Sequence, residues 1–219
     1  MGEWAVVRVF KDADCGRIAA MLERFPFYYR MGLLVGLMAV VAGVDFWRHG
    51  REGSKYREYG FVLIAGMAGA LAGFVNDWIT SSISPDYFIL GKGLEAGSDL
   101  RLRAGVFGLK TGLSAGIIGG AVCLFAAARK SGFPPEQARA MLQALWMPVL
   151  GAVLLGVTLP VIAGGFDPVG LSARLDAVLK AEQIARFRLV WWIHTGLYAG
   201  LAAGLAAMIV RTKGGKNEN

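Results

Sequence analysis

The sequence contains few cysteines, and this scarcity excludes whole classes of protein. Only two, Cys15 and Cys123, occur among the 219 residues, and Cys123 lies inside an apolar run. Two cysteines cannot build the disulfide framework of a small secreted domain, and no metal-binding spacing surrounds them. We therefore predict no metal site, and no motif in the sequence indicates a cofactor.

Charged residues are scarce as well. They make up 18% of the chain against 55% hydrophobic residues, whereas a soluble domain averages about 25% charged and about 45–50% apolar residues. The formal charge of +7 would suggest nucleic acid in a soluble protein, but the sequence shows no nucleic-acid-binding module, so we predict no such partner. Because the basic residues flank apolar runs, we expect them to face the anionic headgroups of a lipid bilayer.

The N-terminal region lacks the uninterrupted apolar core of a cleavable signal peptide. Seven charged residues break it up: Arg8, Lys11, Asp12, Asp14, Arg17, Glu23 and Arg24. We predict an interfacial or partner-binding segment over residues 1–30, a transmembrane bundle over 31–211 and a polar tail over 212–219.

Five apolar runs predict an all-α, integral membrane helical bundle. The last four runs are each long enough to cross about 30 Å of hydrocarbon at about 1.5 Å per residue. The first has an uncharged core of only Met31 to Val44, so a re-entrant or surface helix is the alternative there. The predicted spans cover residues 31–47, 59–79, 104–128, 142–164 and 188–210.

A further helix is predicted on the membrane surface over residues 172–187. Apolar residues alternate there with two oppositely charged pairs at i,i+4 spacing, Asp176/Lys180 and Glu182/Arg186, behind Ser172 as a helix cap. Amphipathic helices of this kind lie in the plane of the interface.

Glycines recur at four-residue spacing in the third and fifth spans, as in a glycine zipper. Small residues at this spacing let two helices approach backbone to backbone. The partner could be another helix of the same chain or a second chain in a homo-oligomer or membrane complex. The glycines are Gly108, Gly112, Gly116 and Gly120 in the third span and Gly196, Gly200 and Gly204 in the fifth.

A polar and acidic cluster ends the second span, where charge is costly and is usually kept for a reason. Asp77, Thr80 and Ser84 fall on one face if the helix continues past Val75. Ser84, Pro85 and Asp86 follow the order of a helix start, with a cap, a first-position proline and an acid near the positive end of the dipole.

Crossing parity brings this cluster towards the fifth span. The second span ends on the side of the membrane where the fifth begins, so Asp77 and His194 share a leaflet, and Lys110 lies there too. Such an acid, base and cation could form a proton relay, a substrate pocket or a mutually neutralising structural network. The candidate functional residues are Asp77, Thr80, Ser84, Asp86, Tyr87, Lys92, Lys110, His194 and Tyr198.

The segment from Asp77 to Phe88, with Lys92 after it, resembles an Asp-x-x-Thr-x-x-Ile-Ser-Pro-Glu-Tyr-Phe motif of small, uncharacterised bacterial polytopic membrane proteins. Asp86 departs from the glutamate of that motif. In the same proteins a late span carries a histidine followed by a tyrosine and glycines, which His194 and Tyr198 resemble. The resemblance implies a shared architecture in the bacterial inner membrane and names no activity.

Three functions fit these features. The first is a small channel or transporter, or a proton-linked permeation unit, acting through Asp77 and His194. The second is a structural or accessory subunit of a larger membrane complex. The third, which the sequence favours least, is a membrane enzyme acting on lipid with these two residues as acid and base, since no known catalytic signature is present and no catalytic residue is assigned.

Overall fold

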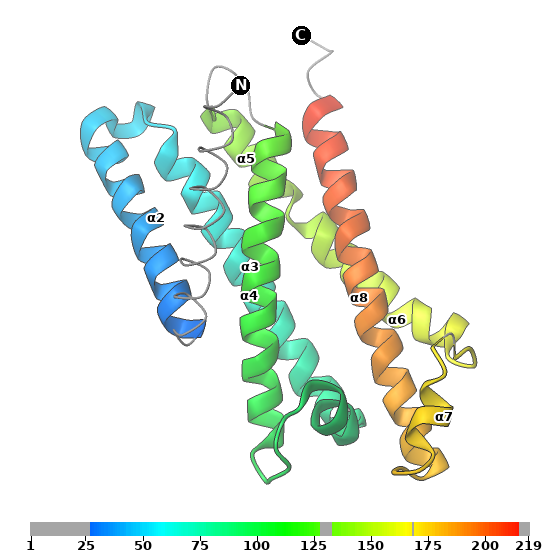
Figure 1. Ribbon diagram of the computed structural model, residues 1–219. Helices are drawn as coiled ribbons and strands as arrows, with labels where there is room; N and C mark the ends of the chain where they lie inside the picture. The colour runs from blue at the N-terminus through cyan, green and yellow to red at the C-terminus, as the bar shows by residue number, and fades with distance from the viewer. Residues whose placement is uncertain (1–26, 128–132, 168, 215–219) are drawn as a thin grey trace, which may run out of the picture. The chain divides into compact units, whose positions relative to one another are not determined.

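The computed structural model describes residues 27–127, 133–167 and 169–214 (Figure 1), and within this part of the chain every regular element is a helix. Five helical segments are long and apolar enough to cross a membrane: Tyr29–Glu52, Lys55–Ile83, Leu100–Ala127, Pro135–Ala163 and Ala181–Thr212. The prediction of an all-α membrane bundle with five spans is confirmed, and the chain is a multi-pass membrane protein. Of the N-terminal segment predicted for residues 1–30, residues 1–26 lie outside the described part.

The chain forms two compact units, Met1–Tyr56 and Arg57–Asn219. The first contains α2 (Phe27–His49), the short helix η1 (Gly50–Glu52) and the first residues of α3 (Lys55–Ile83). Asp45 joins these elements, because its carboxylate accepts the backbone N–H of Lys55 at 2.7 Å and lies 3.2 Å from Nδ1 of His49. The acid therefore caps the start of α3, where backbone N–H groups have no partner within the helix.

In the second unit, α3 packs against α4 (Leu100–Ala127) through glycines on both helices. A Cβ added at Gly112 would lie 2.1 Å from the carbonyl oxygen of Gly69, and one added at Gly108 would lie 2.2 Å from that of Gly73. Real Cβ atoms essentially never come within 3.0 Å of such an atom. Only glycine therefore permits this close antiparallel approach of the two backbones.

The second glycine stripe lies along α8 (Ala181–Gly214) and packs in the same way against α6 (Trp146–Ala163). A Cβ at Gly196 would lie 2.1 Å from the oxygen of Leu155, and one at Gly200 would lie 2.0 Å from that of Gly151. Both stripes predicted from the sequence are thus in contact with helices of the same chain.

The fourth span consists of two helices, α5 (Pro135–Ala144) and α6, joined at Leu145. Pro148 has no N–H, so the carbonyl of Ala144 loses its helical donor, and Leu145 closes a tighter turn onto Leu142. The apolar segment formed by α5 and α6 together runs from Pro135 to Ala163, so the fourth span begins earlier than the predicted range of 142–164.

The segment predicted as one surface helix over 172–187 contains two elements. A short helix, α7 (Leu171–Leu175), is followed by a turn, and α8 begins at Ala181. The predicted cap is also wrong: the Asp167 carboxylate, rather than Ser172, accepts the N–H groups at the start of α7, those of Leu171 and Ser172.

The break before α8 has its own local cause. The side chain of Gln183 accepts the backbone N–H of Lys180 at 3.0 Å, which is half of a capping box and starts a new helix. No proline interrupts the chain from there to Gly214, so the first turns of the fifth span replace the second half of the predicted surface helix. The helix also extends three residues into the predicted tail, as far as Gly214.

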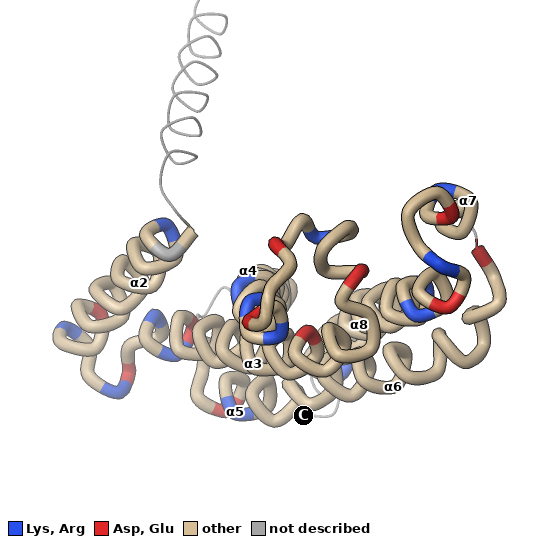
Figure 2. Tube along the Cα trace, turned by 90° about the horizontal axis from the view of Figure 1, so that it is seen from below, with Lys and Arg blue, Asp and Glu red and all other residues tan. Residues whose placement is uncertain are grey.

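Both short connecting helices lie at the end of the unit where α3 and α6 finish and α4 and α8 begin. One is α7; the other is η2 (Tyr87–Gly91), a turn of π-helix between α3 and α4. Phe88 of η2 is fully buried with Leu100 and Ala104 of α4 and Phe187 and Val190 of α8. Viewed from below, acidic and basic residues gather at helix ends and connections, and α7 with the adjoining end of α8 carries both signs (Figure 2).

Candidate functional site

Asp77 and His194 form a buried pair that joins α3 to α8. Nε2 of His194 lies 3.0 Å from Oδ1 of Asp77, and the two side chains are 5% and 6% exposed. Asp77 follows Ala65, Gly69 and Gly73 at four-residue spacing on α3, so it occupies the next position of the stripe that contacts α4. Gly108 makes room for it, because a Cβ there would lie 2.8 Å from the Cβ of Asp77.

The other ring nitrogen of His194 fixes its tautomer. Nδ1 lies 2.9 Å from the carbonyl oxygen of Val190, and a carbonyl can only accept, so the hydrogen-bond geometry assigns the proton to Nδ1. In a neutral ring Nε2 then carries a lone pair, and so does the Asp77 oxygen that faces it. A hydrogen bond at 3.0 Å between two such atoms requires one further proton, held either by the carboxyl group or by Nε2.

Asn76 completes the polar group from the same helix. Its amide Nδ2 donates to Oδ1 of Asp77 at 2.9 Å and lies 3.3 Å from Nε2 of His194. An amide N–H that donates to the carboxylate stabilises its charged form. Asn76 is not among the residues predicted from the sequence, although its place beside Asp77 at the end of a span was a usable signal.

Two aromatic rings of η2 cover the histidine. The ring of Tyr87 stacks on that of His194 with centroids 4.9 Å apart, and the ring of Phe88 meets it edge-on at 6.0 Å. Burial raises the pKa of the Tyr87 hydroxyl above its usual range, and Tyr198 and Asp77 raise it further. Tyr87 is therefore a neutral lid on the pair. The ammonium group of Lys92 lies 5.5 Å from the centre of the Tyr87 ring.

Three predicted residues have local hydrogen bonds that explain their positions. The Thr80 hydroxyl donates to the Asn76 carbonyl at 2.8 Å, within its own helix. The Ser84 hydroxyl accepts the backbone N–H of Tyr87 at 3.3 Å, as a helix cap does. Asp86 accepts the side-chain amide of Gln183 at 3.3 Å and so ties η2 to the start of α8.

The last two predicted residues lie at the edge of the group. Tyr198 follows His194 by one turn of α8, and about half of its surface is exposed. Lys110 lies on α4 two residues beyond Gly108 and is partly buried. The structure thus brings Asp77, Tyr87 and His194 into direct contact and places the other predicted residues around them.

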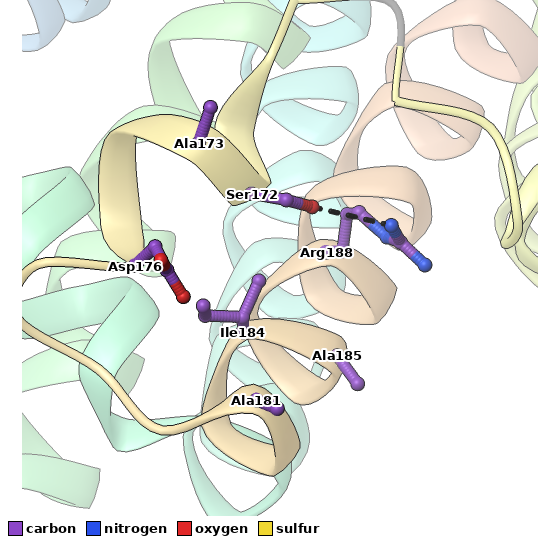
Figure 3. Close-up of a pocket in the computed structure, with 7 residues that line it drawn as sticks. All are labelled: Ser172, Ala173, Asp176, Ala181, Ile184, Ala185 and Arg188. Atoms are coloured by element: carbon purple, nitrogen blue, oxygen red, sulfur yellow. Dashed lines mark hydrogen bonds between the residues drawn. The ribbon is translucent and has the colours of Figure 1, made fainter.

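A separate, open pocket of about 360 Å³ lies between α7 and the start of α8 (Figure 3). Its polar lining includes Asp176 and Arg188, and Arg188 donates to the Ser172 hydroxyl at 3.3 Å. Near it, backbone hydrogen bonds from the start of α7, chiefly that of Ser172, lower the pKa of Asp167. Among the described residues, no group of three His, Cys, Asp or Glu side chains could hold a metal ion.

Comparisons with protein-family models, curated proteins and solved structures found no match to this chain. Function is therefore inferred from the buried Asp77–His194 pair and its surroundings.

Proposed function

We propose that this protein is a proton-linked transport protein, acting through a proton held between Asp77 and His194. The observation that carries the proposal is the 3.0 Å contact between Oδ1 and Nε2, in which each atom offers a lone pair unless one proton lies between them. A proton held inside a membrane span can be taken up and released, and acid–histidine chains are used in this way by pumps and transporters.

A purely structural role explains the pair less well. An ionised side chain costs about 2.5–3.5 kcal/mol at the centre of a membrane span on insertion scales, and less towards the end of a span, where Asp77 lies. Apolar residues of similar volume often replace a buried ion pair without loss of stability. Glycine contacts already join α3 to α4, and a second set joins α6 to α8, so the bond between Asp77 and His194 is not what holds either helix pair together.

The accessory-subunit function has less support from the structure than from the sequence. Its main support was the possibility that the glycine stripes dock a partner, but both stripes contact helices of the same chain. A stoichiometric partner or a homo-oligomer is the alternative that the test below can reveal. The motif resemblance supports the bacterial inner membrane as the location.

The test is proton movement into proteoliposomes that contain the purified protein and a trapped pH-sensitive dye. A potassium gradient with valinomycin supplies the driving voltage. We expect the wild-type protein to acidify the lumen, and we expect Asp77→Asn and His194→Gln to elute as folded protein and lose this flux. His49→Gln is the matched control, because His49 also lies beside an aspartate but is exposed and belongs to the first unit.

Infrared spectroscopy supplies a readout that needs no transported solute. A band from a protonated carboxyl group that appears and disappears with pH, and is absent from Asp77→Asn, would show proton exchange at the pair. No proton flux and no such band in the wild type would overturn the proposal. A partner that copurifies with the wild type and is lost from both variants would identify an accessory subunit instead.

A further inference from the structure

The third and fifth spans contain the same sequence pattern. Residues 106–120 read VFGLKTGLSAGIIGG, and residues 190–204 read VWWIHTGLYAGLAAG. Seven of the fifteen positions are identical, among them the continuous Thr-Gly-Leu and the three glycines at four-residue spacing. In this alignment Lys110 takes the position of His194.

The aligned positions make the same contacts in the structure. Gly112 and Gly196 each approach a carbonyl oxygen of the preceding long helix, and an added Cβ would lie 2.1 Å from it in both cases. The hydroxyl groups of Thr111 and Thr195 each donate to the carbonyl four residues earlier, at 3.2 and 2.9 Å. Sequence and packing therefore define two repeats, the first made of α3, η2 and α4 and the second of α6, α7 and α8.

The two repeats have the same order and direction. Each has a long helix, a short helix begun by a side-chain cap, and a long helix that returns with its glycines against the first. The caps are Ser84 in the first repeat and Asp167 in the second. Transporters built from parallel repeats bind substrate and coupling ions where the repeats meet.

The contacts within a repeat differ in kind from those between repeats. Within each repeat, backbone meets backbone at glycines, so neither helix can slide without a clash. Between repeats, the contacts are made by side chains: Asp77 with His194, Asp86 with Gln183, and Tyr87 with Phe187. Side chains can change rotamer, so the boundary between the repeats is the more adjustable interface.

We infer that the two repeats move as rigid halves and that the proton between Asp77 and His194 holds them together, which makes the protein a carrier rather than a fixed pore. This inference rests on the proposed function. With the proton present, the pair forms a hydrogen bond across the boundary. Without it, two lone pairs face each other at 3.0 Å and share only the side-chain amide of Asn76 as a donor, so their repulsion favours separation of the halves.

Other ionisable groups surround this boundary and must be controlled in any test of pH. Beside Asp77 and His194 themselves, they are Asp86, Tyr87, Lys92, Arg101, Lys110 and Tyr198, which belong to η2 and its flanking residues, α4 and α8.

The experiment measures the distance between two spin labels, one in each repeat, as pH changes. Ser98→Cys and Ala177→Cys place the labels at exposed positions of the two connections, after replacement of Cys15 by Ser and Cys123 by Ala. Between pH 5 and pH 9 we expect the distance to shift by more than ~2 Å. Asp77→Asn should abolish the shift, and His194→Gln is the second variant should Asp77→Asn fail to fold.

A label pair inside the second repeat is the matched control. Val161→Cys on α6 and Ala203→Cys on α8 are both exposed, and their distance should stay constant over the same pH range. An unchanged distance between the repeats, or a shift that persists in both pair variants, would overturn the inference. Proton flux without any shift in distance would support the proposed function and refute the moving halves. A shift in distance without proton flux would refute the proposed function alone.

Discussion

The glycine contact between α3 and α4 gives the sharpest prediction for stability, through Gly112→Ala. The added Cβ would lie 2.1 Å from the Gly69 oxygen, whereas real contacts of this kind stay beyond 3.0 Å, so the helices must separate locally by about 1 Å. A gap of about 0.5–1 Å forfeits a quarter to a half of the dispersion energy of each contact it affects. Because the backbones touch at successive glycines, the loss extends along the interface.

The expected magnitude follows from two opposing terms. Replacing glycine by alanine in a helix gains about 1 kcal/mol of intrinsic propensity. Overpacking a well-filled interface costs about 1–3 kcal/mol or more, and the backbone contact here places the cost at the upper end. We therefore expect Gly112→Ala to destabilise the protein by about 2 kcal/mol, and the larger Gly112→Leu to disrupt folding.

Gly60→Ala on α3 is the matched control, because a Cβ added there meets no atom within 4 Å. It should leave stability unchanged or raise it by up to about 1 kcal/mol. The assay is thermal or denaturant unfolding of the detergent-solubilised protein, followed by size-exclusion chromatography. Equal stability of Gly112→Ala and Gly60→Ala would refute the backbone-contact reasoning.

Two further predictions concern the repeats and the start of α7. Leu205 packs on Gly119 across the two repeats, so a disulfide formed by Gly119→Cys with Leu205→Cys should block proton flux until it is reduced. The control pair, Gly156→Cys with Leu197→Cys, lies within the second repeat and should cross-link without changing the flux. Equal effects of the two cross-links would count against moving halves. In the folded protein the pKa of Asp167 lies below its ordinary value of 3.8. The carboxylate therefore stabilises α7 fully above about pH 3.8, and this stabilisation is lost as the pH falls through the lower pKa of the folded protein. Hydrogen exchange of the first α7 amides should rise over that interval, and an identical rise in Asp167→Asn would show that another group is responsible.

The five spans can be predicted from the sequence alone, because the length of an apolar run and the thickness of a bilayer define a crossing almost without reference to other residues. The sequence also places Asp77 and His194 at the same end of the bundle, since crossing parity depends only on the number of spans. The repeat of 106–120 at 190–204 was readable as well, since the third and fifth spans share seven of these fifteen positions.

Which atoms meet depends on how the helices pack. Glycine spacing shows that a helix has a smooth face but not which helix covers it, and the partners proved to be α3 and α6. Residues 172–187 are divided between two elements because the side chains of Asp167 and Gln183 bond to nearby backbone N–H groups. Such local hydrogen bonds differ only slightly in free energy from those of a continuous helix. The proton that we propose between Asp77 and His194 is argued from a distance and from the bond of the other ring nitrogen to Val190, and neither is set until the helices have packed.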